Sequence, residues 1–199
     1  MLTKHKSFFE PLFDKIAVRL TRIHPHYLTL LSLLFSVVFF IALQLKWYIP
    51  GLIFYLGQLF DALDGFVARK THKVTAFGGF LDSTSDRFSD FFLLAGFGYA
   101  NLVPWELVVP AIATSFFISY VRSRAEFASS KAISFSHGIM ERTERIMLVF
   151  IAFFCFLLFP ALQILHMSVL VFAFIILVVF NSITLLQRIF IVYKSLHAA

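Results

Sequence analysis

The sequence predicts an all-α integral membrane protein with six transmembrane helices, preceded by an amphipathic helix at the membrane surface. The chain has 199 residues, of which 60% are hydrophobic and 28 are phenylalanine. Soluble domains contain only about 45–50% apolar residues, so a soluble fold could not bury this excess. Because no polar linker or low-complexity segment divides the sequence, we expect one membrane domain over residues 25–199.

Six apolar stretches approach the length of about 20 residues that a bilayer-spanning helix needs. They cover residues 27–45, 48–66, 77–102, 104–127, 146–165 and 167–192. The second and third stretches carry aspartates toward one end. The fourth begins with Pro104, which is harmless in the first turn of a helix because the N–H there has no helical partner.

The basic residues give these stretches an orientation. All but two of the 17 Lys and Arg residues, Lys46 and Arg87, fall on one side of the predicted helices. An excess of Lys and Arg marks the cytoplasmic face. We therefore expect a multi-pass protein of the plasma membrane, with both termini cytoplasmic and no nucleic-acid partner.

Residues 1–24 have a different pattern, in which apolar residues recur at helical spacing and basic residues fill most of the positions between them. This pattern predicts an amphipathic helix that lies in the interface and favours anionic lipid headgroups. It does not fit a cleaved signal peptide, since Glu10, Pro11 and Asp14 interrupt any apolar core.

Four aspartates form two pairs near the expected cytoplasmic boundary: Asp61 with Asp64, and Asp82 with Asp86. Residues three or four apart share one face of a helix, so two antiparallel helices can bring the four carboxylates together. Such a group repels itself unless a cation lies among its members. Carboxylate oxygens without Cys or His favour Mg²⁺, Mn²⁺ or Ca²⁺ over zinc.

A purely structural role is the alternative for these aspartates, as ion-pair partners of nearby basic residues such as Arg69 and Arg87. Ionisable groups inside membrane spans are functional by default, because packing never requires them. Small residues surround the aspartates, among them Gly65, Ala68 and Gly78. They allow a ligand to approach the backbone, and Arg69 is placed to meet a phosphate.

The complete pattern over residues 61–86 is D-x2-D-G-x2-A-R-x8-G-x3-D-x3-D. It resembles the signature of the CDP-alcohol phosphotransferases and departs from it at no position. The apolar stretches and the amphipathic start also resemble that family, so the resemblance covers the whole chain. It implies a homodimeric membrane enzyme that transfers a phosphoalcohol from a CDP-linked donor to an acceptor hydroxyl and releases CMP.

The resemblance also implies roles for individual residues. One or two divalent cations, Mg²⁺ or Mn²⁺, would be held by Asp61, Asp64, Asp82 and Asp86. Asp86 would in addition be the base that takes the acceptor's proton. The CDP-linked donor would be bound by Asp61, Asp64, Gly65, Ala68, Arg69, Gly78 and Asp82. Asp90 lies outside the signature, and we expect it to support the site or to pair with Arg87.

A second basic cluster bears on the acceptor. Its members are Arg122, Arg124, Arg142, Arg145 and Arg188. Topology alone could explain an excess of basic residues, but all five are Arg, whose forked guanidinium binds phosphate bidentately. The cluster resembles the phosphatidylinositol-phosphate synthase branch, including its archaeal members, and this implies inositol phosphate as the acceptor.

The acceptor and the donor tails stay open at this point. Arg122 stands where bacterial members of the branch have Lys, and Thr143 stands where Pro is familiar. Glycerol-3-phosphate, as in phosphatidylglycerophosphate synthases, is therefore an alternative acceptor. The donor is CDP-diacylglycerol or CDP-archaeol, with a di-inositol-phosphate synthase using CDP-inositol as a further alternative.

Three other classes of membrane protein fit less well. A prenyltransferase is expected to carry a second Asp-rich motif, but no Asp follows Asp90. An intramembrane aspartyl protease needs two isolated aspartates. A divalent-cation transporter needs polar residues through several spans. Outside the signature, we expect Pro25 and Thr29 to shape the donor end of the pocket, and we assign the histidines, including His26, to interface and loop roles.

Overall fold

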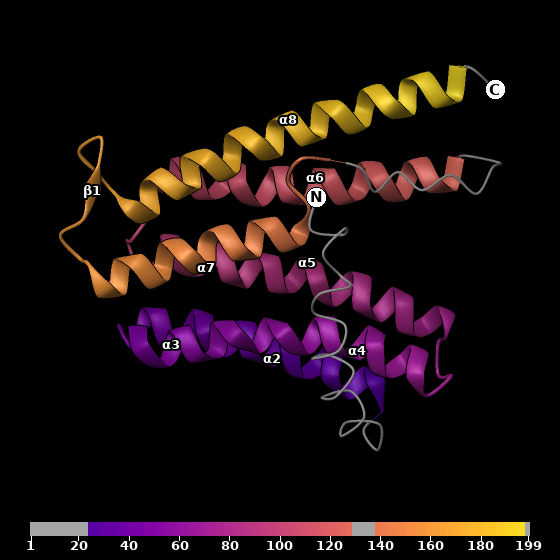
Figure 1. The fold of residues 1–199 in the computed structure, drawn as a ribbon, viewed down its shortest axis with the longest axis horizontal. Helices are drawn as coiled ribbons and strands as arrows, with labels where there is room; N and C mark the ends of the chain where they lie inside the picture. The colour runs from indigo at the N-terminus through magenta and orange to yellow at the C-terminus, as the bar shows by residue number, and fades with distance from the viewer. Residues whose placement is uncertain (1–23, 129–137, 198–199) are drawn as a thin grey trace. The chain divides into compact units, whose positions relative to one another are not determined.

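The computed structural model describes residues 24–128 and 138–197, and this part of the chain is helical apart from one short hairpin (Figure 1). It forms two compact units, Met1–Ala100 and Asn101–Ala199. The predicted amphipathic helix over residues 1–24 lies outside the described residues except for His24. The division into that helix and one membrane domain over residues 25–199 stays a prediction.

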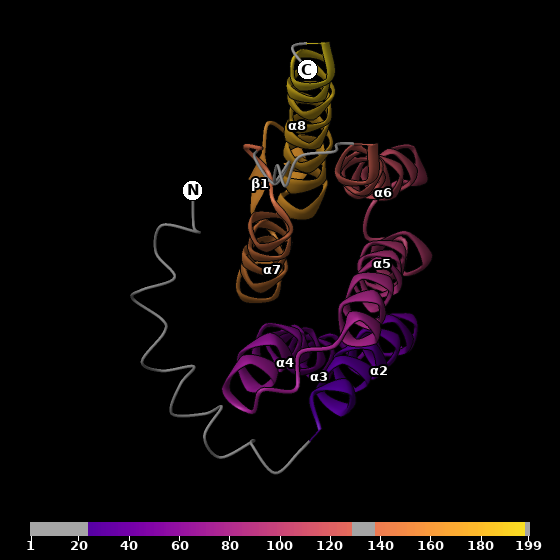
Figure 2. The ribbon, with the colours of Figure 1, turned by 90° about the vertical axis from the view of Figure 1, so that its right-hand side faces the viewer.

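The first unit contains three long helical segments. They are α2 (Pro25–Gln44), a broken helix made of α3 (Tyr48–Tyr55), the 3₁₀ turn η2 (Leu56–Gln58) and α4 (Leu59–Lys70), and α5 (Ala76–Tyr99). Helix α2 packs against both α4 and α5, as Figure 2 shows for this unit. Pro25 occupies the first turn of α2, where its missing N–H costs nothing.

Aromatic rings hold α2 against its neighbours. The fully buried Phe39 packs with its ring centroid 5.3 Å from that of Tyr55 and 5.7 Å from that of Phe97. Ser36 and Ser89 share a hydrogen bond of 3.4 Å between α2 and α5. These contacts fix α5 against α2, and they thereby set the position of the aspartates that precede Phe97 on α5.

The second predicted span, 48–66, is interrupted in the structure and then extended. A Cβ atom on Gly57 would collide with the side chain of Phe35, so the close approach of α2 requires glycine in the 3₁₀ turn. Helix α4 continues to Lys70 and ends at Thr71. Ala68 and Arg69 therefore lie on the same helix as Asp61 and Asp64, about two turns beyond Asp61 and one turn beyond Asp64.

The second unit contains α6 (Trp105–Ala128), α7 (Arg142–Leu158), the strands β1 (Gln163–Ile164) and β2 (Met167–Ser168), and α8 (Val169–His197). Helix α8 packs against α6 and α7. The fully buried Asn181 of α8 donates hydrogen bonds of 3.1 Å to the hydroxyls of Thr114 and Ser115 on α6. These two hydrogen bonds from the buried Nδ2 atom favour one register of the two helices.

Helix α7 differs from the predicted span 146–165 at both ends. It begins earlier, at Arg142, and ends at Leu158, shortly before Pro160. A proline disfavours helical backbone in the residue before it, and Phe159 accordingly leaves the helix, with φ −133° and ψ 69°. Leu165 and His166 both have positive φ and connect β1 to β2, as a two-residue hairpin turn of this kind requires.

Three helical segments of the described residues are long and apolar enough to cross a membrane: Pro25–Gln44, Tyr48–Lys70 and Val169–His197. The other long helices carry more charge or are shorter, since α5 contains three aspartates and Arg87, and α7 has 17 residues. The apolar helices agree with a membrane protein. The number of six crossings and the cytoplasmic orientation stay predictions.

Candidate active site

Three of the four signature aspartates meet in the first unit. Asp61 and Asp64 come from α4 and Asp82 from α5, and one carboxylate oxygen of each lies within 4.8 Å of the others. Asp64 is buried, with 6% of its surface exposed, whereas Asp61 and Asp82 are half-buried. The pairing of two helices expected from the spacing is therefore present for these three residues.

The donor atoms of this group fit a hard divalent cation. Two carboxylates at this separation repel each other by about 3 kcal/mol at an effective dielectric constant of about 20. A cation bound among the three would offset that repulsion. Three carboxylate oxygens, with no sulfur or imidazole in the group, are the ligands that Mg²⁺ and Mn²⁺ prefer.

Residues from α2 and the start of α5 support the aspartates. The hydroxyl of Thr29 donates a hydrogen bond to Oδ2 of the buried Asp64. Thr75 caps α5 by accepting a hydrogen bond of 3.0 Å from the backbone N–H of Gly78. The carboxylate of Asp64 and the first turn of α5 are thus held by contacts that involve no ligand.

A cleft of about 240 Å³ opens beside the aspartates. It is lined by Pro25, His26, Thr29, Asp64, Gly65, Ala68, Arg69, Lys73, Val74, Thr75, Gly78, Gly79 and Asp82. Six of the seven residues expected to bind the donor are in this set, and Asp61 belongs to the adjoining carboxylate group. Pro25 and Thr29 also line the cleft, at the position expected for them.

Arg69 lies on the cleft wall with its side chain folded over the helix. Its guanidinium carbon is 4.9 Å from the centre of the Phe66 ring. A Cβ atom on Gly65 would lie 3.3 Å from Nη1 of Arg69, which is a tight contact. Glycine at position 65 therefore leaves room for the Arg69 guanidinium along α4.

Three polar residues of the cleft are not expected from the sequence: His26, Lys73 and Thr75, which caps α5. His26 packs edge-on against Phe77, with ring centroids 5.6 Å apart, and its ring faces Gly78. Lys73 follows α4 in the turn to α5, where its backbone N–H bonds to Ala68 O at 2.9 Å. The sequence offers one indication that His26 lies at the cleft: it follows Pro25, which is expected to shape the pocket.

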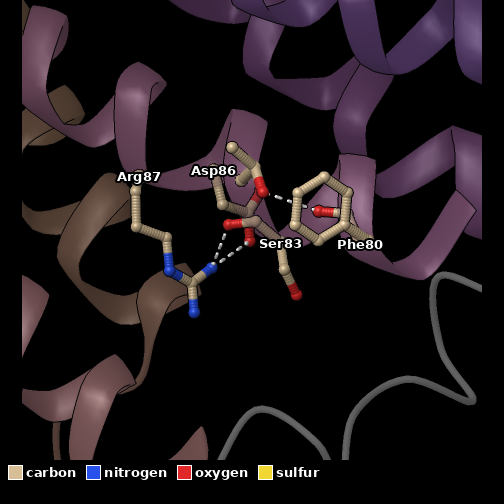
Figure 3. A network of polar contacts seen from close by, with 5 residues as sticks. Phe80, Ser83, Asp86 and Arg87 are labelled. Carbon is tan, nitrogen blue, oxygen red and sulfur yellow. Dashed lines mark hydrogen bonds and ion pairs between the residues drawn. The ribbon is translucent and has the colours of Figure 1, made fainter. Parts of the chain in front are cut away.

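Asp86 lies one turn after Asp82 on α5 and is not among the three carboxylates that meet within 4.8 Å. Its Oδ2 is 3.3 Å from Nη1 of Arg87, which also donates to Ser83 O (Figure 3). The sequence suggested Asp90 as an ion-pair partner of Arg87. The structure shows an ion pair of Arg87 with Asp86.

The second unit holds the five arginines expected to bind an acceptor phosphate, and two of them are buried. Arg145 of α7 and Arg188 of α8 each have 6% of their surface exposed. Nη1 of Arg188 donates to Ile118 O of α6 at 3.0 Å. Arg122, Arg145, Glu126 and Glu141 lie close enough to Arg188 to act on its charge.

The other three arginines are more accessible. Arg122 is exposed and pairs with Glu126 at 2.9 Å, one turn along α6. The guanidinium of Arg124 lies 5.3 Å from the centre of the Phe127 ring. Arg142, at the start of α7, is half-buried. Arg122 and Arg145 are thus the two members that lie within electrostatic range of Arg188.

Comparison with known proteins identifies the family. A family model described as CDP-alcohol phosphatidyltransferase matches residues 22–180. The chain belongs to this family. An archaetidylinositol phosphate synthase of Pyrococcus horikoshii is 40% identical over 158 residues, which cover 76% of this chain and 81% of the relative. The CDP-alcohol phosphatidyltransferase is therefore a transferase, as the signature predicted.

Solved structures of a CDP-alcohol phosphatidyltransferase support the same assignment. The phosphatidylinositol phosphate synthase of Mycobacterium tuberculosis with CDP-DAG bound has a TM-score of 0.76 and 27% identity, over 92% of this chain and 94% of that one. Its complex with manganese and citrate has a TM-score of 0.77 and 28% identity, over 91% and 88%. CDP-alcohol phosphatidyltransferases use divalent metals, in agreement with the oxygen-only ligand group.

Gly78 is the cleft glycine at which an added Cβ atom would have the least room, and it gives a first prediction, for Gly78→Ala. The added Cβ would lie 3.0 Å from Thr75 Oγ1 and 3.1 Å from His26 Cε1, so the wall must shift. Overpacking typically costs about 1–3 kcal/mol, and we expect the KM for the CDP-lipid donor to rise about tenfold. Initial rates of CMP release at varied donor concentration measure this change.

Gly79→Ala is the matched control, because a Cβ there meets nothing within 4 Å although Gly79 also lines the cleft. We expect its donor KM to stay within about twofold of the wild-type value, since its new methyl group displaces no neighbour. Equal effects of the two substitutions would mean that crowding at Gly78 does not shape the donor site.

Proposed function

We propose that this enzyme transfers a phosphatidyl-type group from a CDP-linked lipid to a hydroxyl of inositol phosphate and releases CMP. The observation that carries the proposal is the meeting of Asp61, Asp64 and Asp82 beside a cleft lined by the remaining donor-binding residues of the signature. The family assignment gives the reaction class. The named relatives make inositol-containing phospholipids, which supports this acceptor.

The donor would lie in the cleft of the first unit. The glycines and Ala68 let the nucleotide approach the backbone, and Arg69 and Lys73 offer positive charge to its phosphates. Asp61, Asp64, Asp82 and Asp86 would hold the divalent metal, which when bound orients the donor diphosphate and neutralises charge on the leaving group. The CDP-lipid complex of the Mycobacterium tuberculosis structure supports a donor of this kind.

The chemistry left to the protein is proton transfer and positioning. Asp86 would accept the proton of the inositol hydroxyl through a carboxylate oxygen. The hydroxyl oxygen would then form a bond to the lipid-linked phosphorus, while the bond from that phosphorus to the oxygen of CMP breaks. Phosphoryl transfer depends mainly on positioning and charge stabilisation, and the described site supplies groups for both.

The arginines of the second unit would bind the acceptor's own phosphate. Arg145 and Arg188 are buried, and a buried guanidinium favours a bound anion. The forked donors of Arg match a phosphate better than the single ammonium of Lys does. Arg122, Arg124 and Arg142 would complete the binding surface. Glycerol-3-phosphate would suit the same charges, so it is the second candidate acceptor.

The setting of the reaction follows from the sequence. The lipid donor requires a membrane, and the excess of basic residues on one side favours a cytoplasmic active site in the plasma membrane. We further propose six crossings, an interfacial N-terminal helix and a homodimer. A His72→Cys variant in sealed vesicles of known orientation tests the topology. Its reaction with a membrane-impermeant thiol reagent reports on which side of the membrane the turn between α4 and α5 lies.

A panel of acceptors tests the function. Purified protein in detergent receives CDP-diacylglycerol or CDP-archaeol with Mg²⁺ or Mn²⁺ and one of inositol phosphate, glycerol-3-phosphate, inositol or serine. We expect CMP release to be fastest with inositol phosphate and to require the metal. Because free inositol lacks the phosphate that the arginines would bind, it should react at least about 100-fold more slowly in kcat/KM. Faster reaction with free inositol would contradict the acceptor assignment.

Arg188→Lys separates the acceptor site from the donor site in the same assay. The substitution keeps the positive charge but loses the fork and the hydrogen bond to Ile118 O. We expect the KM for inositol phosphate to rise about 10- to 30-fold, with the donor KM unchanged. Lys194→Met, which removes a charge packed on Phe190 in the same helix, is the control and should change neither KM.

A further inference from the structure

Arg87 follows Asp86 directly on α5 and lies outside the family signature. Its Nη1 donates a hydrogen bond of 2.8 Å to Ser83 O and lies 3.3 Å from Oδ2 of Asp86 (Figure 3). One nitrogen of the Arg87 guanidinium therefore contacts both a backbone carbonyl of α5 and the Asp86 carboxylate, which is expected to act as the base.

This ion pair is unusual in its geometry. Consecutive residues of an α-helix point about 100° apart around the axis and do not face each other. Arg87 reaches Asp86 because its side chain turns back along α5 to the carbonyl of Ser83, one turn earlier. The backbone thus determines where the guanidinium lies, and the guanidinium in turn meets the carboxylate.

The environment of the pair makes the contact effective. The side chain of Asp86 is 15% exposed and that of Arg87 is 31% exposed. In fully exposed ion pairs, screening by salt removes most of the electrostatic attraction. Partial burial reduces this screening. A donor fixed to the backbone and shielded in this way can select one orientation of the carboxylate.

We propose that Arg87 is a positioning residue, which holds the Asp86 carboxylate in the orientation that accepts the proton of the acceptor hydroxyl. The proposal rests on the proposed function, in which Asp86 is the base. In this role Arg87 would act through Asp86 and not by direct contact with either substrate. Removal of the Arg87 guanidinium should therefore slow the chemical step and leave the binding of both substrates unchanged.

The test compares Arg87→Met and Arg87→Lys with the wild-type full chain, by steady-state CMP release with inositol phosphate and by Mn²⁺ binding. We expect Arg87→Met to lower kcat about 30- to 100-fold, because a misplaced catalytic group costs about that much. Both KM values should stay within about threefold, the pattern of a loss confined to the transition state. The Mn²⁺ affinity should fall by no more than about tenfold, because Asp61, Asp64 and Asp82 keep their positions and only the orientation of Asp86 is lost. Arg87→Lys keeps a donor at this position and should recover about tenfold of the lost kcat.

Thr84→Ala is the control for local damage to the helix. It removes a neighbouring side-chain hydrogen bond, of 2.8 Å to Phe80 O, on the same helix (Figure 3). We expect wild-type kcat for this variant. Retention of wild-type kcat in Arg87→Met, or equal losses in the Met and Lys variants with a lowered thermal midpoint, would overturn the positioning role. Wild-type protein that releases no CMP would instead overturn the proposed function.

Discussion

Asp86→Asn is expected to reduce kcat for CMP release by at least about 1,000-fold, within the range of about 100- to 10,000-fold that a general base contributes. The amide has almost the shape of the carboxylate but cannot accept the proton of the acceptor hydroxyl. The measurement is the rate of CMP release from the CDP-linked lipid at saturating inositol phosphate and Mn²⁺. Donor binding, measured separately at equilibrium, should change much less.

Asp90→Asn is the matched control for this prediction, because it makes the same chemical change one turn further along α5, outside the signature. We expect it to retain kcat within about threefold, as substitutions away from reacting groups usually do. Wild-type activity in Asp86→Asn would remove Asp86 from the role of base. Equal losses in both variants would point to the summed charge of α5 rather than to one carboxylate.

Asp64→Asn is expected to weaken Mn²⁺ binding by at least about 100-fold, because it removes a negatively charged oxygen ligand, and the attraction of one unit charge pair at about 4 Å is about 4 kcal/mol at an effective dielectric constant of about 20. Asp64 is the most buried of the three carboxylates, so water can replace it least easily. Electron paramagnetic resonance of added Mn²⁺ measures the bound fraction, and CMP release should fall in parallel at fixed metal concentration.

Thr29→Val provides a graded comparison for the metal site. It removes the hydroxyl that bonds to Asp64 and keeps the carboxylate and the side-chain volume. Loss of an orienting partner typically costs 10- to 100-fold in metal affinity, and we expect about tenfold here. The thermal stability of Asp64→Asn, by contrast, should not fall, because this substitution removes a buried charge. Normal Mn²⁺ affinity in that variant would show that the three aspartates are not the metal site.

The sequence by itself determined the features that depend on local spacing. Helical positions followed from apolar stretches, and α2, α5, α6 and α8 begin or end within a few residues of their predicted bounds. The pairing of Asp61 with Asp64 follows from the period of a helix, because residues three apart lie on one face in any helix. The family signature is also a local pattern, and the family match confirmed it.

The tertiary structure decided which of these local features meet. Asp82 joins Asp61 and Asp64 in the close group, whereas Asp86 contacts Arg87. His26 reaches the cleft because α2 packs against α4 and α5, and no spacing along the chain encodes that contact. In the second unit, burial separates Arg145 and Arg188 from the exposed Arg122 and Arg124. Contacts between helices depend on packing and register, and these arise only when side chains distant in sequence fit together.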